Sequence, residues 1–229
     1  MQPNERIPPL VLALFASGLS LALLYVAFRF IDVPSDTLRV WTNLDNEKSI
    51  ATWFSTVQLL VPSILLAPLI VSAFARRQGH PWALLLLALL FVGLSADESI
   101  EAHEYLGNLS DKMLPNDDRG ATFFSATGIW MFVLGVPFVI VLGLLIRTLR
   151  GEFARVPGVT TKLIVGGAIW LGGALGIELL RNVVDHDSAL GIAQVFFEET
   201  AEMMGVTVMV WGFYQLLIGC GFRWELADI

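Results

Sequence analysis

Long apolar runs separated by short polar links make up most of the chain. Six of these runs reach or approach the roughly 20 residues that an α-helix needs to cross a bilayer. This pattern predicts an all-α fold: an integral membrane bundle of six transmembrane helices that forms a single domain over residues 1–229. We expect the helices at Pro9–Phe28, Ile50–Ala75, Trp82–His103, Phe123–Ile146, Lys162–Val184 and Ala193–Phe222.

The composition supports a membrane protein and argues against a soluble one. The 229 residues are 55% hydrophobic and 15% charged, with a mean hydropathy of +0.70, whereas a soluble domain has about 25% charged residues. The first apolar run is longer than the core of a cleavable signal, so we expect it to be retained as a helix. The one cysteine, Cys220, excludes an internal disulfide and a metal site built from several cysteines.

The distribution of lysine and arginine predicts the orientation of the bundle. Eight of the 14 lysines and arginines fall in the two termini and in the links on their side, which include Arg76, Arg77 and residues 147–162. That side has only four of the 21 acidic residues. We therefore expect both termini in the cytoplasm, the acidic side facing outward, and a multi-pass location in the cell inner (plasma) membrane.

Ionisable residues within or beside the apolar runs form three groups. A charge at membrane depth costs a few kcal/mol or more, so each such residue is a candidate for a functional site. Because the spans alternate in direction, all three groups are expected in the outer leaflet or at its rim. They comprise Asp97, Glu98, Glu101, His103 and Glu104; Glu178, Arg181, Asp185 and His186; and Glu198, Glu199 and Glu202.

Helical spacing predicts which of these side chains share a face. Asp97, Glu101 and Glu104 form one stripe at spacings of four and three. On an ideal helix His103 points away from that stripe, and it joins the stripe only if the helix ends, bulges or turns shortly afterwards. In the other two groups the acids also share a face. Arg181 is expected either as the internal counter-ion of Glu178 or Asp185 or as a site for a substrate anion.

A fourth contributor to the acidic side is Glu47, just before the second run. Two interpretations stay open at this point. Glu47 is either an exposed loop acid beside an interfacial tryptophan, Trp53, or a member of the same site as the three groups.

Four short segments of the chain are similar to those of a group of bacterial multi-span membrane proteins that have no established activity. The segments are Trp53-Phe54-Ser55, Ser95-x-Asp97-Glu98 with His103-Glu104, Gly173-x-x-Gly176-x-Glu178, and Glu198-Glu199-x-x-Glu202-Met203-x-Gly205. The resemblance covers most of the chain. It implies that Asp97, Glu98, His103, Glu104, Glu178, Glu198, Glu199 and Glu202 form a recurring set that does not include Glu101.

Several carboxylates and imidazoles on facing helices are the ligand chemistry of di-iron and di-manganese bundles. Oxygen ligands combined with imidazole suit Fe, Mn or Zn. Like charges this close in a low dielectric cannot all ionise unless a cation or shared protons neutralise them. We therefore expect a divalent metal (Fe, Mn or Zn) among the acids and histidines of the three groups, although the Glu-x-x-His spacing of soluble di-iron bundles is absent.

A bound metal would permit either hydrolysis through a metal-bound water or oxygen-dependent oxidation of a lipid-soluble substrate. Two other functions stay open: an accessory or structural subunit of a larger membrane complex, and a proton-coupled transporter, because chains of acids and histidines carry protons across membranes. Membrane lipids are the partners expected in every case. Other membrane subunits are expected in addition if the protein is an accessory or structural subunit. The basic residues are too sparse for nucleic acid.

Overall fold

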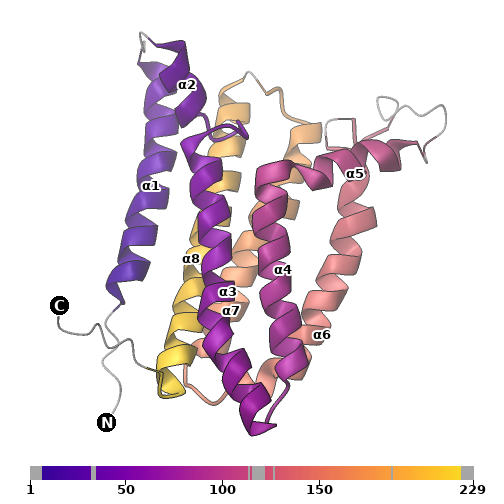
Figure 1. Ribbon diagram of the computed structural model, residues 1–229. Helices are drawn as coiled ribbons and strands as arrows, with labels where there is room; N and C mark the ends of the chain where they lie inside the picture. Colours follow the sequence, from indigo (N-terminus) through magenta and orange to yellow (C-terminus); the bar gives the residue numbers. More distant parts are fainter. Residues whose placement is uncertain are drawn as a thin grey trace.

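The computed structural model describes residues 7–31, 35–112, 114, 122–125, 127–186 and 188–222, with the side chains of 104, 107, 110 and 111 outside the description. The regular structure of these residues is helical throughout (Figure 1). Six helical stretches are long and apolar enough to cross a membrane, which confirms the predicted all-α, multi-span class.

The six spans follow the predicted order with shifted ends. The first three are α1 (Pro9–Phe30), α3 (Ile50–Arg76) and α4 (Pro81–Ile100). The fourth joins η3, a π-helical turn (Met131–Gly135), to α6 (Val136–Phe153). The fifth joins α7 (Val159–Leu171) to a second π-helical segment, η4 (Gly172–Ile177), and to a 3₁₀ turn, η5 (Glu178–Asn182). The last is α8 (Ala189–Gly219).

Two of the spans differ clearly from the prediction. The fourth begins at Met131 and not at Phe123, because residues 122–125 and 127 form bends and turns and Gly128 has a positive φ. The third ends at Ile100 and not at His103, because Glu101 adopts a left-handed conformation with φ 54°. A non-glycine residue in that conformation stops an α-helix.

Two shorter helices lie outside the spans. They are α2 (Asp36–Thr42), after α1, and α5 (Ala102–Asp111), directly after α4. Figure 1 shows α5 running across one end of the bundle. Serine side chains at positions 35, 49 and 188 each accept a backbone N–H and so cap the helices α2, α3 and α8.

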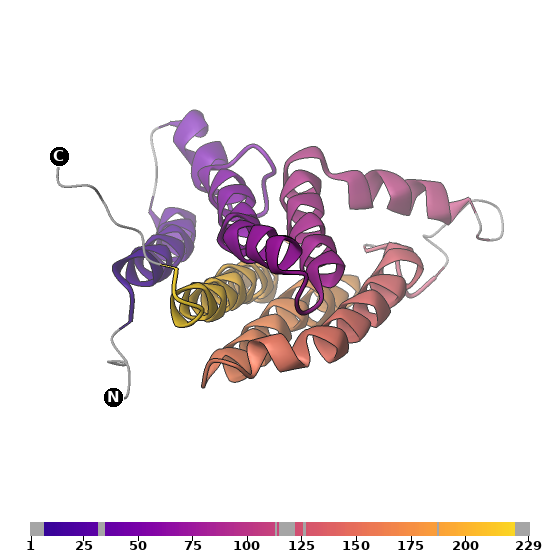
Figure 2. The same cartoon turned by 60° about the horizontal axis from the view of Figure 1, so that its bottom comes forward.

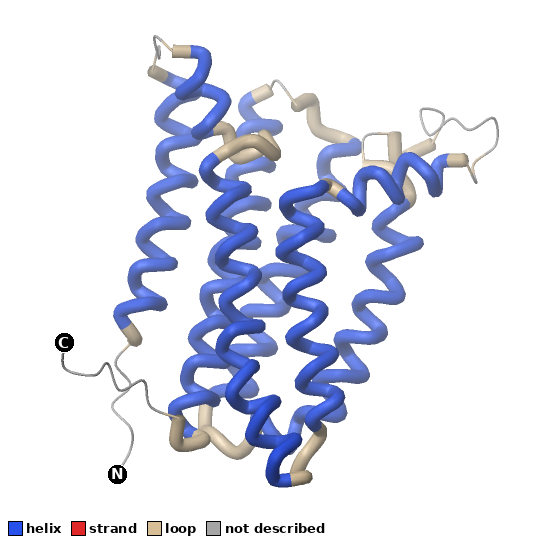
Figure 3. Tube along the Cα trace, in the orientation of Figure 1, coloured by secondary structure: helices blue, strands red, loops and turns tan. Residues whose placement is uncertain are grey.

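Helix α8 is the central element of the bundle. It contacts α1, α3 and α7, and the view toward the ends of the helices shows these three around it (Figure 2). Helices α3 and α4 pack as an antiparallel pair, and α6 contacts both α4 and α7. Short loops join α3 to α4 and α6 to α7, as the tube in Figure 3 shows. Any side chain on the inner face of α8 is therefore enclosed by the bundle.

Glycines let α7 and α8 approach closely. A Cβ atom on Gly166 would lie 2.7 Å from the carbonyl oxygen of Gly205, and one on Gly205 would lie 2.5 Å from the backbone nitrogen of Trp170. Farther along, a Cβ on Gly173 would meet the backbone of Glu198 and the side chain of Glu202, each at 2.9 Å. Small residues at such crossings permit close backbone packing in membranes, and here they bring the acidic part of α8 against α7.

We predict that Gly205→Ala destabilises the bundle, because the added methyl group collides with backbone atoms that cannot rotate away. Overpacking of this kind costs about 1–3 kcal/mol, so the midpoint of thermal unfolding in detergent should fall by several degrees. Gly143→Ala is the matched control, since a Cβ there meets nothing within 4 Å. Equal midpoints for the two variants would contradict the close packing.

Candidate functional site

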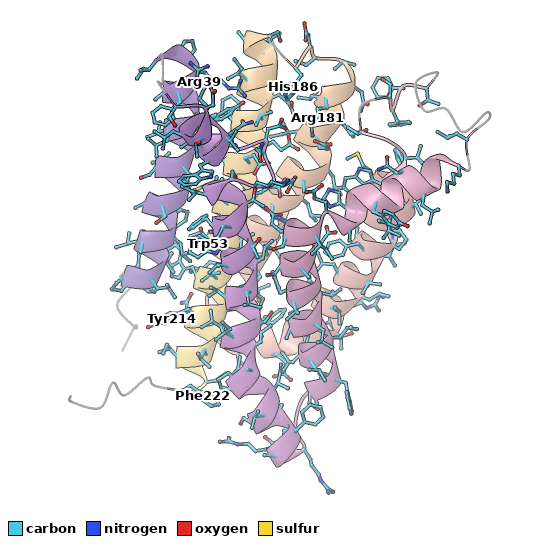
Figure 4. All side chains as sticks on the ribbon, turned by 45° about the horizontal axis from the view of Figure 1, so that its top comes forward. Arg39, Trp53, Arg181, His186, Tyr214 and Phe222 are labelled. Carbon is cyan, nitrogen blue, oxygen red and sulfur yellow. The ribbon has the colours of Figure 1, made fainter. Side chains whose placement is uncertain are left out.

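A cavity of about 680 Å³ lies inside the bundle, toward the end at which α5 crosses. Its lining comes from α3, α4, α5, the fourth and fifth spans, α8 and the loop before α3. Figure 4 shows Arg181 and His186, which line the cavity, at one end of the bundle and Tyr214 and Phe222 at the other. The acidic residues of the lining are Glu47, Asp97, Glu98, Glu178, Glu198, Glu199 and Glu202.

The break at Glu101 brings His103 back toward Asp97. The backbone N–H of His103 donates to Asp97 Oδ1 at 2.8 Å, and its ring Nδ1 lies 2.9 Å from Asp97 Oδ2. The imidazole also packs against the ring of Trp130, with centroids 4.9 Å apart. The helix ends at position 101, so the condition under which His103 is expected to join Asp97 is met.

The fifth span changes its helical period just where its charged residues begin. The π-helical segment η4 gives way to the 3₁₀ turn η5, in which residues three apart eclipse each other. Glu178 and Arg181 consequently face the same way, with Arg181 Nη1 3.6 Å from Glu178 Oε2. Asn182 contacts Thr127 instead, at 2.9 Å from its amide nitrogen to the hydroxyl. The counter-ion predicted for Glu178 is in place.

Helix α8 supplies three carboxylates from neighbouring positions. Glu198 and Glu202 lie one turn apart, and Glu199 follows Glu198. The carboxyl of Glu198 accepts a hydrogen bond from the amide of Gln194, and the carboxyl of Glu178 lies close enough to interact with it electrostatically. Two carboxyl groups this close require a proton between them or a cation beside them.

The loop before α3 closes the outer side of the cavity. Glu47 lines the cavity although it is exposed, so it combines the two interpretations left open by the sequence. The carboxylate of Asp45, in the same loop, lies 2.9 Å from Arg181 Nη2 through Oδ1 and 3.3 Å from His186 Nε2 through Oδ2. Sequence reasoning missed Asp45. The available signal was its position two residues before Glu47 in a polar loop on the acidic side.

The carboxylates form one electrostatic group. Glu202 interacts with Glu98, Glu198 and Glu178 across three elements. Glu199 interacts with Glu202 and Glu98. Among the lining residues that the structure describes, Arg181 is the one permanently charged cation, and it is shared with Asp45 outside the lining. The interior therefore has a large negative excess.

The deeper part of the cavity is apolar. It is lined by Leu59, Leu94, Leu134, Phe138, Trp170, Leu171, Ala174 and Leu175. Several lining residues belong to the two π-helical segments: Leu134 and Gly135 lie in η3, and Ala174 and Leu175 lie in η4. Leu171 directly precedes η4. Wider π-turns recur at functional sites in helices. Polar groups at one end and apolar groups at the other suit an amphiphilic ligand.

The structure places the predicted site residues in three ways. It brings Asp97, Glu98, His103, Glu178, Arg181, His186, Glu198, Glu199 and Glu202 to the cavity. The lining does not include Glu101, which ends α4, or Asp185, which is exposed. The 3₁₀ turn ends at Asn182 and so removes Asp185 from the face of Glu178. Glu104 lies in α5, and its side chain is outside the described part.

The side chains as they stand are engaged with protein partners. In the described part of the chain, no three histidine, cysteine, aspartate or glutamate side chains take up positions that could hold a metal ion. Asp97 is paired with His103, and Glu198 with Gln194 and Glu178. A metal would therefore have to draw carboxylates away from these partners.

Comparison with known families gives a match over residues 10–217 to the family described as Domain of unknown function (DUF8692). The chain belongs to this family. No curated protein and no solved structure matches the chain. The match spans all six membrane helices, so the DUF8692 domain includes the whole cavity.

We predict that Arg181→Gln lowers the thermal stability of this DUF8692 protein, because Asp45 and Glu178 lose their shared counter-charge. In the double variant, Asp45→Asn should restore about half of the stability that Arg181→Gln alone removes. The expected coupling between the two positions is about 1 kcal/mol for a partly exposed ion pair. Thermal unfolding of the two single variants and the double variant measures it, and strictly additive effects would show that the pair makes no net contribution.

Proposed function

We propose that the carboxylate-lined cavity binds a divalent metal cation, Fe, Mn or Zn, and that the protein acts on a lipid-soluble substrate there. The observation that carries the proposal is the convergence of acids from α4, η5, α8 and the loop before α3 on one enclosed space. Four separate segments contribute to it, so the grouping is a property of the fold and not of one acidic stretch.

The charge of the cavity favours a cation. Burying several carboxylates together is costly unless positive charge or protons neutralise them. Arg181 is already shared between Asp45 and Glu178. A divalent metal neutralises two carboxylates at once, and oxygen ligands with an imidazole are suitable for Fe, Mn and Zn.

His103 has the surroundings of a metal ligand. Histidines that bind metals usually donate their other ring nitrogen to a carboxylate, which fixes the tautomer and the ring orientation. Asp97 is in that position relative to Nδ1 of His103. His103 and the carboxylates of Glu98 and Glu202 line the same cavity and would together form a mixed oxygen and nitrogen ligand set.

The apolar depth of the cavity supports a lipid-soluble substrate. A substrate with a polar head and an apolar tail would place its head among the carboxylates and its tail against residues such as Leu134, Phe138 and Leu175. A metal at the head group would supply a Lewis acid or an activated water for hydrolysis, or a redox centre for oxidation. The neighbouring carboxylates would accept the protons that either reaction releases.

We further propose that the acidic end faces away from the cytoplasm. Helix α1 begins and α8 ends at the opposite end of the bundle (Figure 1). That end also has Arg76, Arg77 and the basic residues of the link between α6 and α7. The excess of basic residues in cytoplasmic links of membrane proteins supports both termini inside and a location in the inner (plasma) membrane.

Elemental analysis of the purified protein tests the metal. We expect about one equivalent or more of Fe, Mn or Zn in the wild-type protein and a loss of most of it in Glu178→Gln and Glu202→Gln. Glu101→Gln is the matched control, since it removes an acid from the same end of the bundle that does not line the cavity. A metal-free wild-type protein, grown with all three metals supplied, would refute the proposal.

The single cysteine tests the orientation. Cys220 follows α8 and is exposed. Partial burial raises the pKa of its thiol, which reduces the reactive thiolate at neutral pH, so labelling is best done near pH 8.5. A membrane-impermeant maleimide should label Cys220 only after the cells are permeabilised. Lys112→Cys in a Cys220→Ala background should be labelled in intact cells, and the reverse pattern would overturn the orientation.

A proton-handling site is the second candidate, and the contact between the Glu178 and Glu198 carboxyls favours it. Farther along α8 from Glu202, the next buried polar contact is made by Gln58 of α3, whose amide donates to Thr207 Oγ1 at 2.5 Å. The rest of α8 beyond Glu202 has no acid. A relay across the whole membrane therefore has less support than a cation site at one end, and the metal analysis separates the two.

A further inference from the structure

A second cavity, of about 420 Å³, lies beside the first at the same end of the bundle. The end of α1, helix α2 and the start of the loop before α3 enclose it. Its lining residues are Tyr25, Phe28, Arg29, Phe30, Ile31, Arg39, Val40, Thr42, Asn43 and Asn46. None of these described residues is acidic and two are arginines, in contrast to the lining of the carboxylate cavity.

We propose that this basic cavity binds the phosphate group of an anionic phospholipid whose chains lie along α1. The proposal is independent of the metal site. Arginine is suited to this ligand because its planar guanidinium can donate two parallel hydrogen bonds to phosphate oxygens. Two arginines, from α1 and α2, line one small space at the end of a membrane span.

The partners of Arg29 are neutral. Its guanidinium lies over the Tyr25 ring, 5.0 Å from the ring centre. Its Nη2 donates to Tyr25 Oη and to Asn43 Oδ1, each at 3.3 Å. These contacts hold the side chain in place without neutralising it. A phosphate would add the negative charge that the guanidinium does not receive from these partners.

The remaining polar groups of the cavity are mostly donors. The amide oxygens of Asn43 and Asn46 accept hydrogen bonds from Arg29 and from the backbone of Lys48. Both residues line the cavity, and their amide nitrogens are hydrogen-bond donors. The hydroxyl of Tyr25 accepts from Arg29 and so can donate its own hydrogen. Such a set matches an anion with several acceptor oxygens.

The surroundings point to a lipid. Phe30 and Ile31 border the cavity and are 81% and 58% exposed. The exposed face of α1 continues with Leu24, Leu23 and Leu19. Acyl chains can follow this apolar surface while the head group stays at the arginines, and a basic residue close to an anionic membrane surface attracts such lipids by about 1 kcal/mol.

Native mass spectrometry of the full-length protein with phosphatidylglycerol or phosphatidylcholine tests the site. The measured quantity is the ratio of the apparent affinities for the first bound molecule of each lipid. We expect the wild-type protein to favour phosphatidylglycerol, and Arg29→Gln and Arg39→Gln each to lower the ratio about fivefold. Lys48→Gln is the control, because it removes a positive charge from the adjoining loop outside the cavity lining. It should leave the ratio unchanged.

Three results would overturn the proposal. They are an unchanged ratio in Arg29→Gln and Arg39→Gln, an equal fall in Lys48→Gln, and displacement of phosphatidylglycerol by an equal concentration of inorganic phosphate. The second would indicate general surface attraction, and the third a site for free anions. Unaltered thermal unfolding of the variants, whose replaced side chains are exposed, shows that the fold is retained.

Discussion

The close approach of α7 to α8 is the constraint on which the rest of the structure depends. Backbone atoms meet where Gly166 faces Gly205, and Gly173 leaves room for Glu202. With a larger residue at these positions the helices would separate, and the carboxylates of α8 would no longer reach Glu178. In a membrane no hydrophobic force draws the helices together, so close packing of their backbones has to hold them in contact.

This packing encloses charge where lipid would not accept it. Carboxylates on α8 line a cavity whose walls also come from α3, α4 and the fifth span, and Arg181 joins the loop before α3 to the fifth span through Asp45. The same loop separates two cavities whose linings differ in charge. Leu44 and Glu47 line the acidic one, while Asn43 and Asn46 line the basic one. A movement of this loop would therefore alter both sites together.

Departures from regular helix geometry supply the shape of the acidic cavity. The left-handed residue Glu101 ends α4 and turns His103 toward Asp97. The π-helical segments η3 and η4 supply Leu134, Ala174 and Leu175 to the apolar wall. These irregular turns cost backbone hydrogen bonding and persist only where the surrounding structure holds them. Their concentration around one cavity agrees with a functional site there.

The sequence by itself determined the six spans and the gathering of the acids at one end, because length and hydropathy decide what crosses a bilayer and alternation decides which ends meet. It also identified most of the ionisable residues that line the acidic cavity. Only the tertiary structure decided the roles of His103, Asp45, Glu101 and Asp185. Each of these depends on a break or a change of helical period that an ideal projection does not contain. The basic cavity at Arg29 likewise exists only because α2 and the loop that follows it fold against the end of α1.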